Sequence, residues 1–297
     1  MRLLTSFFFA LLLCSYAQAQ VTSKDSLWIH QGSFAANFSN VSLHNWAAGG
    51  QNSLSLGTVV SLSSSRESET TLWNNKLDFA YGLIRQGESA FRTRKTDDQL
   101  ILASDYGYKI NDRWSVLAGT QVRTQMDVGY EYFKEGTSDE EQRRKISAFM
   151  APGYVMVNLT AQYKYKNLLS LAVSPVSNRI TFVLDDDLAA AGAFGVTPGE
   201  KSRYELGVTL RKTLEFKVME NTTFKSDLNM FSSYKTLDKW VVNWGTLLMM
   251  KVNKYITTNF GTQLIYDPDV DVPKDDGTTG KGVQFKHVLN LGLALTY

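Results

Sequence analysis

The chain has 297 residues, 20% of them charged, with a formal net charge of +2 and one cysteine, Cys14. A charge balance this close to neutral excludes a general attraction to polyanions, so no nucleic-acid partner is expected. The lone cysteine excludes a disulfide framework within the chain.

Residues 1–19 have the pattern of a secretory signal peptide. Arg2 supplies a positive charge, residues 3–13 form an apolar run too short to cross a bilayer, and Ala17 and Ala19 stand at the spacing of a cleavage site. We therefore expect an exported mature domain of residues 20–297 that lacks cysteine and has 30 basic against 29 acidic residues. Beyond the signal, no apolar run approaches the roughly 18 residues of a membrane helix.

The mature part alternates apolar with small or polar residues along most of its length, which is the pattern of strands with two different faces. In residues 71–85, Leu77 and Phe79 fall on one side while Lys76 and Asp78 fall on the other. The predicted strands are residues 32–46, 52–62, 71–85, 98–110, 113–126, 147–164, 168–184, 202–216, 222–234, 240–253, 255–267 and 283–297.

The same alternation would suit a soluble β-sandwich. The signal peptide, strands of ten or more residues and an aromatic fraction of 12% favour a membrane barrel instead, because soluble strands are usually about 5–6 residues long. The expected fold is all-β, a transmembrane antiparallel up-and-down β-barrel of about twelve strands. Pro175 in the segment 168–184 leaves ten or fourteen strands open, since proline cannot donate to a strand ladder.

Connections alternate in length, as they do in barrels with short periplasmic turns and longer outer loops. Short turns are predicted at 111–112, 166–167, 220–221 and 253–254, and long loops at 86–96, 128–145, 185–201 and 268–282. Two connections fit less well, because 47–51 is short where a long loop is expected and 63–70 is longer than a tight turn. The alternation predicts both termini in the periplasm. The last strand ends on Tyr297, which we interpret as an aromatic signal for the barrel-assembly machinery.

Charges within the strands all fall on the polar parity, where they would avoid the cost of facing lipid, about 2–4 kcal/mol each near the midplane. They predict either a polar channel that selects a solute or a salt-bridge network that plugs the barrel. The candidate lumen-lining residues are Lys76, Asp78, Asp105, Lys109, Arg123, Arg203, Glu205, Arg211, Lys225, Asp227 and Lys251.

Other candidate sites are weaker. His30, His44 and His287 show no metal-ligand spacing, and no cofactor or metal is expected. The acidic segments 185–187 and 267–271 lack the glycine and terminal glutamate of an EF-hand and are interpreted as solvated outer loops. No G-x-S-x-G motif or assembled triad is evident, so an enzyme is not expected.

Several segments together resemble an uncharacterised outer-membrane β-barrel family of Bacteroidota, the domain of unknown function 3078. They are residues 41–56 (VSLHNWAAGGQNSLSL), 77–83 (LDFAYGL), 94–98, 151–154, 190–196 and 259–267. The resemblance implies a barrel in the outer membrane of a Gram-negative bacterium, surrounded by outer-membrane lipid, and it brings no catalytic residue. The expected function is a porin-like pore for a small polar solute or, alternatively, a non-conducting envelope scaffold or assembly component that binds a protein or lipid partner.

Overall fold

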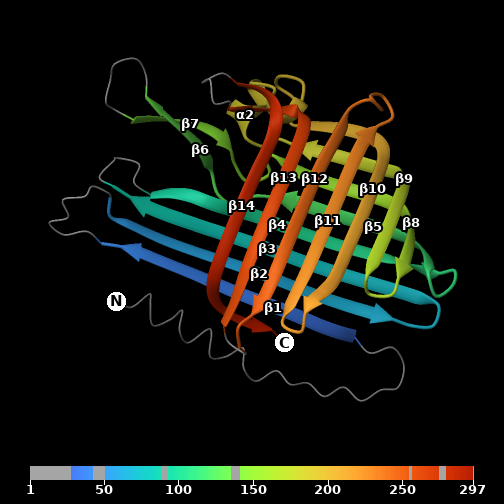
Figure 1. Cartoon of the computed structure of the whole chain (residues 1–297). Coiled ribbons are helices and arrows are strands. Elements are labelled where there is room, and N and C mark those ends of the chain that lie inside the picture. Colours follow the sequence, from blue (N-terminus) through green and yellow to red (C-terminus); the bar gives the residue numbers. More distant parts are fainter. Residues whose placement is uncertain are drawn as a thin grey trace.

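A computed structural model describes residues 28–42, 51–87, 93–134, 141–253, 256–273 and 279–296. Twelve long antiparallel strands form a closed barrel in the order β1-β14-β13-β12-β11-β10-β9-β8-β5-β4-β3-β2, and β6 and β7 form a separate two-stranded sheet (Figure 1). The predicted fold class and strand number are confirmed. No helix of the described part is long and apolar enough to cross a membrane.

The barrel strands are β1 (Trp28–Val41), β2 (Ser53–Glu67), β3 (Thr71–Gln86), β4 (Thr93–Lys109), β5 (Trp114–Thr124), β8 (Gly153–Tyr165), β9 (Leu169–Phe182), β10 (Ser202–Met219), β11 (Thr222–Ser233), β12 (Trp240–Lys251), β13 (Ile256–Pro273) and β14 (Thr279–Thr296). Each strand pairs with the next one along the chain, except that β5 pairs directly with β8. Pro175 lies inside β9, which is one strand and not two.

All four predicted long loops overlap secondary structure: β4 already begins at Thr93, β13 continues to Pro273 and β14 begins at Thr279, and the other two loops hold separate elements. The segment 128–145 holds most of the hairpin of β6 (Gly129–Lys134) and β7 (Glu141–Ser147), which projects from the barrel (Figure 1). The segment 185–201 holds α2 (Asp186–Ala190) and the 3-10 turn η2 (Ala193–Gly195). Asp185 caps α2 by accepting a hydrogen bond from the backbone N–H of Leu188 at 3.1 Å, as acidic residues commonly do before a helix.

The two ends of the barrel differ. We call the end with the brief connections after β2, β4, β8, β10 and β12 the short-turn end, and the opposite end the loop end. β1 begins and β14 finishes at the short-turn end. The connection 63–70, predicted to be longer than a tight turn, is short because β2 continues to Glu67, and the Ser68 hydroxyl then accepts from the N–H of Thr71 at 2.9 Å. The connection 47–51 lies mostly outside the described residues, as do the signal segment and Tyr297.

Apolar side chains cover the outer face of the wall. Each of the following, one from each of eleven of the twelve strands, is more than one third exposed: Phe34, Leu56, Trp73, Leu102, Val116, Val157, Leu171, Leu206, Trp244, Phe260 and Phe285. Aromatic rings gather near the short-turn end, where Trp28 lies 5.3 Å from Trp73, which lies 6.0 Å from Tyr106. An apolar band with an aromatic girdle is the surface that a barrel presents to lipid.

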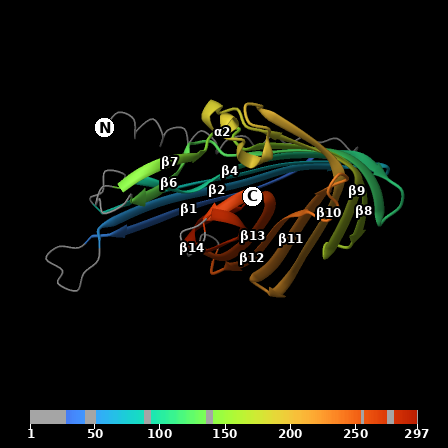
Figure 2. The ribbon, with the colours of Figure 1, turned by 90° about the horizontal axis from the view of Figure 1, so that it is seen from above.

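The barrel is closed by a short seam. β1 pairs with β14 at four positions, Ser33 to Ala36 against Thr296 to Leu293, whereas β1 pairs with β2 over all fourteen of its residues. Seen from above, β1, β2 and β4 face β11–β14 across the interior (Figure 2). The strands of these two sides also cross at a steep angle (Figure 1).

Candidate functional site: the barrel interior

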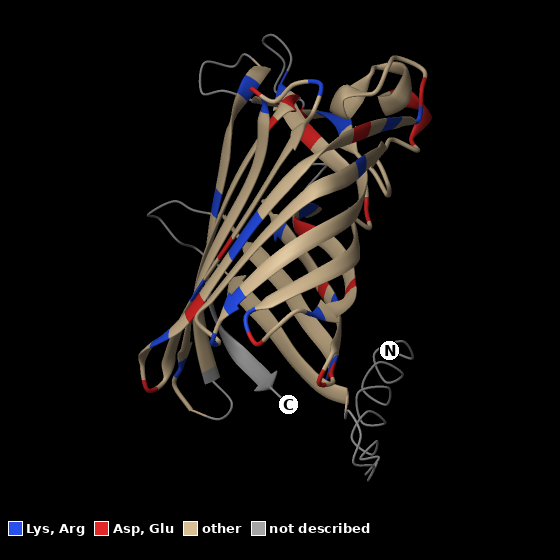
Figure 3. Ribbon diagram, turned by 90° about the vertical axis from the view of Figure 1, so that its right-hand side faces the viewer, with Lys and Arg blue, Asp and Glu red and all other residues tan. Residues whose placement is uncertain are grey.

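The polar parity of each strand faces the interior. Three ion pairs establish this, because each joins strands that are not neighbours in the wall: Arg179 of β9 to Asp267 of β13 at 2.8 Å, Arg211 of β10 to Asp105 of β4 at 3.7 Å, and Lys286 of β14 to Asp97 of β4 at 2.7 Å. In every case three other strands separate the two partners. Both signs of charge therefore meet across the interior, and charges of both signs are visible along the strands in Figure 3.

The eleven charges selected from the sequence lie on strand positions of this inner parity, but in two separate groups. Arg123, Arg203 and Glu205 lie toward the loop end. The other eight lie in the middle or toward the short-turn end: Lys76, Asp78, Asp105, Lys109, Arg211, Lys225, Asp227 and Lys251. The two groups behave differently, as the following contacts show.

Charges of the second group pair mainly along the wall. Lys76 lies 2.6 Å from Asp78 on the same strand, and the Ser61 hydroxyl of the neighbouring strand donates to Asp78 at 2.7 Å. Lys225 lies 3.6 Å from Asp227, whose carboxylate also accepts from the Thr213 hydroxyl at 2.8 Å. Except for the Arg211–Asp105 pair, these contacts leave the centre of the barrel uncrossed.

Toward the loop end, five side chains form a compact cluster that we call the arginine–acid cluster: Arg179, Arg203, Glu205, Asp267 and Asp269. Arg203 lies 2.6 Å from Glu205 and 2.5 Å from Asp269, and Arg179 lies 2.8 Å from Asp267 and 3.9 Å from Glu205. The Arg179 and Asp267 side chains are only 6% and 7% exposed. Buried charges require such pairing, because removing them from water is costly.

The acidic half of this cluster comes from an irregularity in β13. Tyr266 pairs with Val283, but the next paired residue of β13 is Asp271, opposite Lys281. Residues 267–270 of β13 thus stand opposite the single residue Gly282 of β14 and form a bulge. Within it, the Asp267 carboxylate also accepts from the backbone N–H of Asp269 at 3.0 Å. The interpretation of residues 267–271 as a solvated outer loop is therefore wrong for Asp267 and Asp269, which pair with arginines of the wall.

The basic half depends on a second irregularity, in β9. Between Ser174 and Val176 this strand has one residue more than both neighbours, since the register shifts against β8 and β10 at the same place. An extra residue reverses which face the following side chains take. Ala172 thus faces inward before the bulge, and Arg179 faces inward after it. Uninterrupted alternation through Pro175 would have placed Arg179 on the lipid side, which is why sequence reasoning missed it.

The connection between β9 and β10 covers part of the loop end. Val183, Leu188, Ala189 and Val196 pack with Ala151 into a small buried core there. The carbonyl oxygen of Gly195 in η2 accepts a hydrogen bond from Arg203 Nη1 at 3.0 Å. One arginine of the cluster thus fixes this connection over the barrel mouth.

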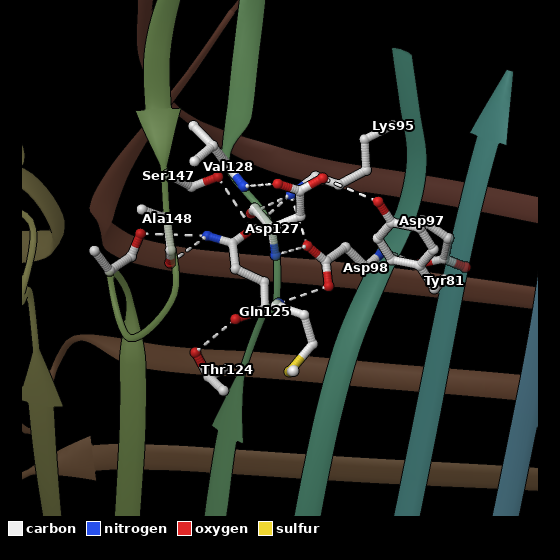
Figure 4. A network of polar contacts seen from close by, with 12 residues as sticks. Tyr81, Lys95, Asp97, Asp98, Thr124, Gln125, Asp127, Val128, Ser147 and Ala148 are labelled. Atoms are coloured by element: carbon white, nitrogen blue, oxygen red, sulfur yellow. Dashed lines mark hydrogen bonds and ion pairs between the residues drawn. The ribbon is translucent and has the colours of Figure 1, made fainter. Parts of the chain in front are cut away.

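On the opposite wall, a polar network holds the chain where it leaves β5 (Figure 4). The Asp98 carboxylate accepts from the backbone N–H groups of Met126 at 2.7 Å and Asp127 at 2.8 Å, and Lys95 Nζ donates to it at 2.8 Å. The Gln125 amide donates to the carbonyl oxygens of Ala148 and Ala151, each at 3.2 Å. These bonds fix the base of the β6–β7 hairpin against the barrel.

A cavity of about 410 Å³ lies between these walls. Side chains from β4, β5, β8, β9, β11, β12, β13 and β14 line it, together with Phe194 of η2, so it is inside the barrel and not on its surface. Its lining includes Arg123 and Arg179, the ring of Tyr154 and several amide side chains. This volume is within the range of about 300–1,000 Å³ that is usual for small-molecule sites.

The remaining sequence candidates lie elsewhere. His30 stacks on Trp28 with ring centroids 6.4 Å apart, and His287 lies 6.1 Å from Phe285, both on the outward parity. His44 lies outside the described residues. In the part of the chain that the structure describes, no three histidine, cysteine or acidic side chains are grouped as metal ligands would be.

Comparison with known proteins adds the following. No curated protein matches the sequence significantly. Among solved structures, an outer membrane channel from Pseudomonas putida F1 has 9% identity over 95% of this chain and 98% of its own, with a TM-score of 0.42. The NanC porin has 10% identity over 89% of this chain and 98% of its own, with a TM-score of 0.41. The toluene transporter TodX of Pseudomonas putida has 9% identity over 93% of this chain and 89% of its own, with a TM-score of 0.36. These likenesses concern the barrel fold alone.

A family model also matches part of the chain. It is described as "Protein of unknown function (DUF3078)" and covers residues 38–130, which extend from the end of β1 through β2–β5 to the start of β6. An origin in Bacteroidota stays a prediction. The family resemblance predicted from the sequence is confirmed over residues 38–130, whereas the segments 151–154, 190–196 and 259–267 lie outside this match.

Proposed function

We propose that this protein is a narrow pore for small polar solutes in the outer membrane of a Gram-negative bacterium. The observation that supports the proposal is the cavity of about 410 Å³ inside the barrel, whose lining combines charged and amide side chains with apolar ones. A barrel whose only task was to be rigid would gain more from a filled apolar interior, because buried charges are costly even when they are paired. An interior of charged and amide side chains around a cavity suits the passage of a hydrated solute.

The cross-lumen ion pairs are expected to make this pore restrictive. Solutes that pass the loop end must displace or bypass the arginine–acid cluster, and those near the middle must pass the Arg211–Asp105 pair. The separation of 3.7 Å between Arg211 and Asp105 leaves this second contact loose. We therefore expect a small unitary conductance, well below that of barrels with 16–18 strands, whose interior is an open aqueous channel.

The test is conductance of the purified full chain in planar bilayers, with Asp267→Asn as the informative variant. Asp267→Asn removes one partner of the arginine–acid cluster, so the proposal predicts discrete steps for the natural sequence and a larger or more frequent step for the variant. Asp186→Asn is the matched control, because it removes a carboxylate from an exposed pair with Lys201 on the outer connection. An absence of conductance in the natural chain and in Asp267→Asn alike would overturn the proposal.

One observation favours the alternative of a non-conducting scaffold. The arginine–acid cluster and the connection fixed by Arg203 together obstruct one end of the barrel. A scaffold predicts no solute flux into liposomes for any of these variants, and a protein or lipid partner that co-purifies in fixed ratio after gentle solubilisation. Isolation of a bare, conducting barrel would exclude this alternative.

We further propose that outer-membrane lipid and the barrel-assembly machinery are partners during biogenesis, with Tyr297 as the signal. Tyr297→Ala should then lower the amount of folded barrel in the membrane, while the unfolding midpoint of the protein that does fold stays close to that of the natural chain. A matched change at an exposed turn residue, Asp112→Ala, should alter neither. A fall in the unfolding midpoint equal to the fall in yield would instead indicate a stability effect.

A further inference from the structure

The cavity contains a guanidinium without an acidic partner. Arg123 is on the inner face of β5, opposite Tyr154 of β8, and lines the cavity. Among the described residues, no ion pair or hydrogen bond involves the Arg123 side chain, which is only partly exposed. A shielded cation with five unused N–H donors is unfavourable unless something else supplies the acceptors.

Arg179 adds a second unused group to the same space. Its Nη2 donates to Asp267, but Nη1 is buried without a hydrogen-bond partner, with Glu205 3.9 Å away. The Arg179 guanidinium also lies 4.7 Å from the centre of the Tyr154 ring, and Tyr154 is the register partner of Arg123. The two arginines therefore flank one aromatic side chain and face the cavity together.

The carboxylates that line the cavity are already engaged. Asp97 pairs with Lys286, Asp98 pairs with Lys95 and accepts two backbone N–H groups, and Asp267 pairs with Arg179. They are therefore neutralised where they stand, whereas Arg123 is not. Arg123 is therefore the charged group of the cavity lining, within the described residues, that would attract an anion.

The other polar groups around the cavity suit hydroxyl groups. Gln121, Asn229 and Gln284 line it, and none of their side-chain amides forms a hydrogen bond among the described residues. Each amide offers both donors and an acceptor. The volume equals that of about fourteen water molecules in the liquid, which is enough for a ligand of monosaccharide size together with some of its hydration.

We infer that this cavity is a binding site for a small hydroxylated carboxylate, such as a sugar acid. Arg123 would hold the carboxylate, with the Arg179 guanidinium beside it, since guanidinium groups bind carboxylates through paired, charge-assisted hydrogen bonds. The amides would bind the hydroxyls. The inference rests on the proposed pore in that it names the class of solute, but binding to the site can be measured without any conductance.

The primary test is equilibrium binding of glucuronate to the detergent-solubilised full chain by calorimetry, with glucose as the uncharged probe. We expect glucuronate to bind more tightly than glucose. Arg123→Gln should weaken glucuronate binding by about 10–150-fold, the value of hydrogen bonds to a charged group, and leave glucose nearly unchanged. Arg123→Lys keeps the charge but loses the planar guanidinium, so its affinity for glucuronate should lie between those of the natural chain and Arg123→Gln. Arg144→Gln removes an exposed arginine of the β6–β7 hairpin and is the control.

Conductance separates this inference from the proposed function. Glucuronate binding that depends on Arg123 supports the site even if no pore is observed. A conducting barrel that binds neither probe, or that binds glucuronate equally well with and without Arg123, overturns the site but leaves the pore standing. If Arg123→Gln yields little folded protein, the loss of glucuronate binding in folded Arg123→Lys is the deciding measurement, and undiminished binding there counts against the paired hydrogen bonds.

Discussion

Asp267→Asn is the change that most directly tests the packing of the barrel interior. It retains the size of the side chain and an oxygen that can accept from the Asp269 N–H, but it removes the charge opposite Arg179. Arg179 would remain buried, with Glu205 as its nearest other carboxylate at 3.9 Å. The variant therefore isolates the value of one ion pair that crosses the lumen.

The expected cost follows from burial. Breaking a buried ion pair on one side usually costs about 3–5 kcal/mol, because the remaining charge is left uncompensated. Glu205 can take over part of the interaction, so we expect about 3 kcal/mol of lost unfolding free energy. The pair between Asp186 and Lys201, whose side chains are 86% and 53% exposed, should contribute only about 0–1 kcal/mol.

The assay is urea unfolding of the barrel in lipid vesicles, followed by tryptophan fluorescence. With a slope of about 1–3 kcal/mol per molar urea, Asp267→Asn should lower the midpoint by about 1 M or more. Asp186→Asn should leave it nearly unchanged. Replacing both partners, as Arg179→Leu with Asp267→Leu, should recover much of the loss, since a buried pair replaced by apolar residues is often close to neutral.

The reasoning would be refuted if Asp267→Asn destabilised the barrel no more than Asp186→Asn does. That result would mean that Arg179 reaches water in the folded protein. The reasoning would also be contradicted if Arg179→Leu with Asp267→Leu were less stable than either single variant. The lost free energy of unfolding would then come from side-chain packing and not from the uncompensated charge.

Two further predictions concern other parts of the molecule. An alanine at Gly119 would place its Cβ against the Asp105 carboxylate, so Gly119→Ala should disturb the central ion pair and lower the unfolding free energy by about 1 kcal/mol. Gly245→Ala on the same inner face, where the nearest atom is 3.9 Å away, should leave the urea midpoint unchanged. The hydrogen bond from Lys145 lowers the pKa of Asp185, so its stabilising effect is present above the ordinary pKa of about 3.9 and disappears as the pH falls through the lowered value. Asp185→Asn should therefore destabilise the protein more at pH 7 than at pH 3, and an equal effect at the two pH values would contradict this assignment.

Strand alternation was enough to predict the barrel and its approximate strand number, and it assigned the eleven selected charges to one parity of their strands. Every strand must keep lipid on one face, so the period of two carries strong information. The strand that contains Pro175 shows the limit of this reasoning. A bulge reverses the alternation, and nothing in the sequence before or after Arg179 states whether one has occurred.

Contacts between distant strands could not be predicted in the same way. Asp267 continues the inward parity of β13, so its direction was available from the sequence, but the following bulge and the partner on β9 were not. Arg123 was selected for its parity, yet its lack of a carboxylate partner depends on which charges of other strands reach one another. The hairpin β6–β7 was missed because its strands of six and seven residues are too short to stand out from a loop.

The bulge in β13 has a consequence for how this barrel could change. Its acidic groups belong to the backbone path of a wall strand, not to a separate loop folded back into the lumen. Trimming the outer connections would therefore leave the carboxylates of the arginine–acid cluster in place. Insertion or loss of a single residue within the bulge would instead change the direction of a carboxylate. A one-residue length change at this point would therefore alter the charges that face the interior while all twelve strands keep their pairing.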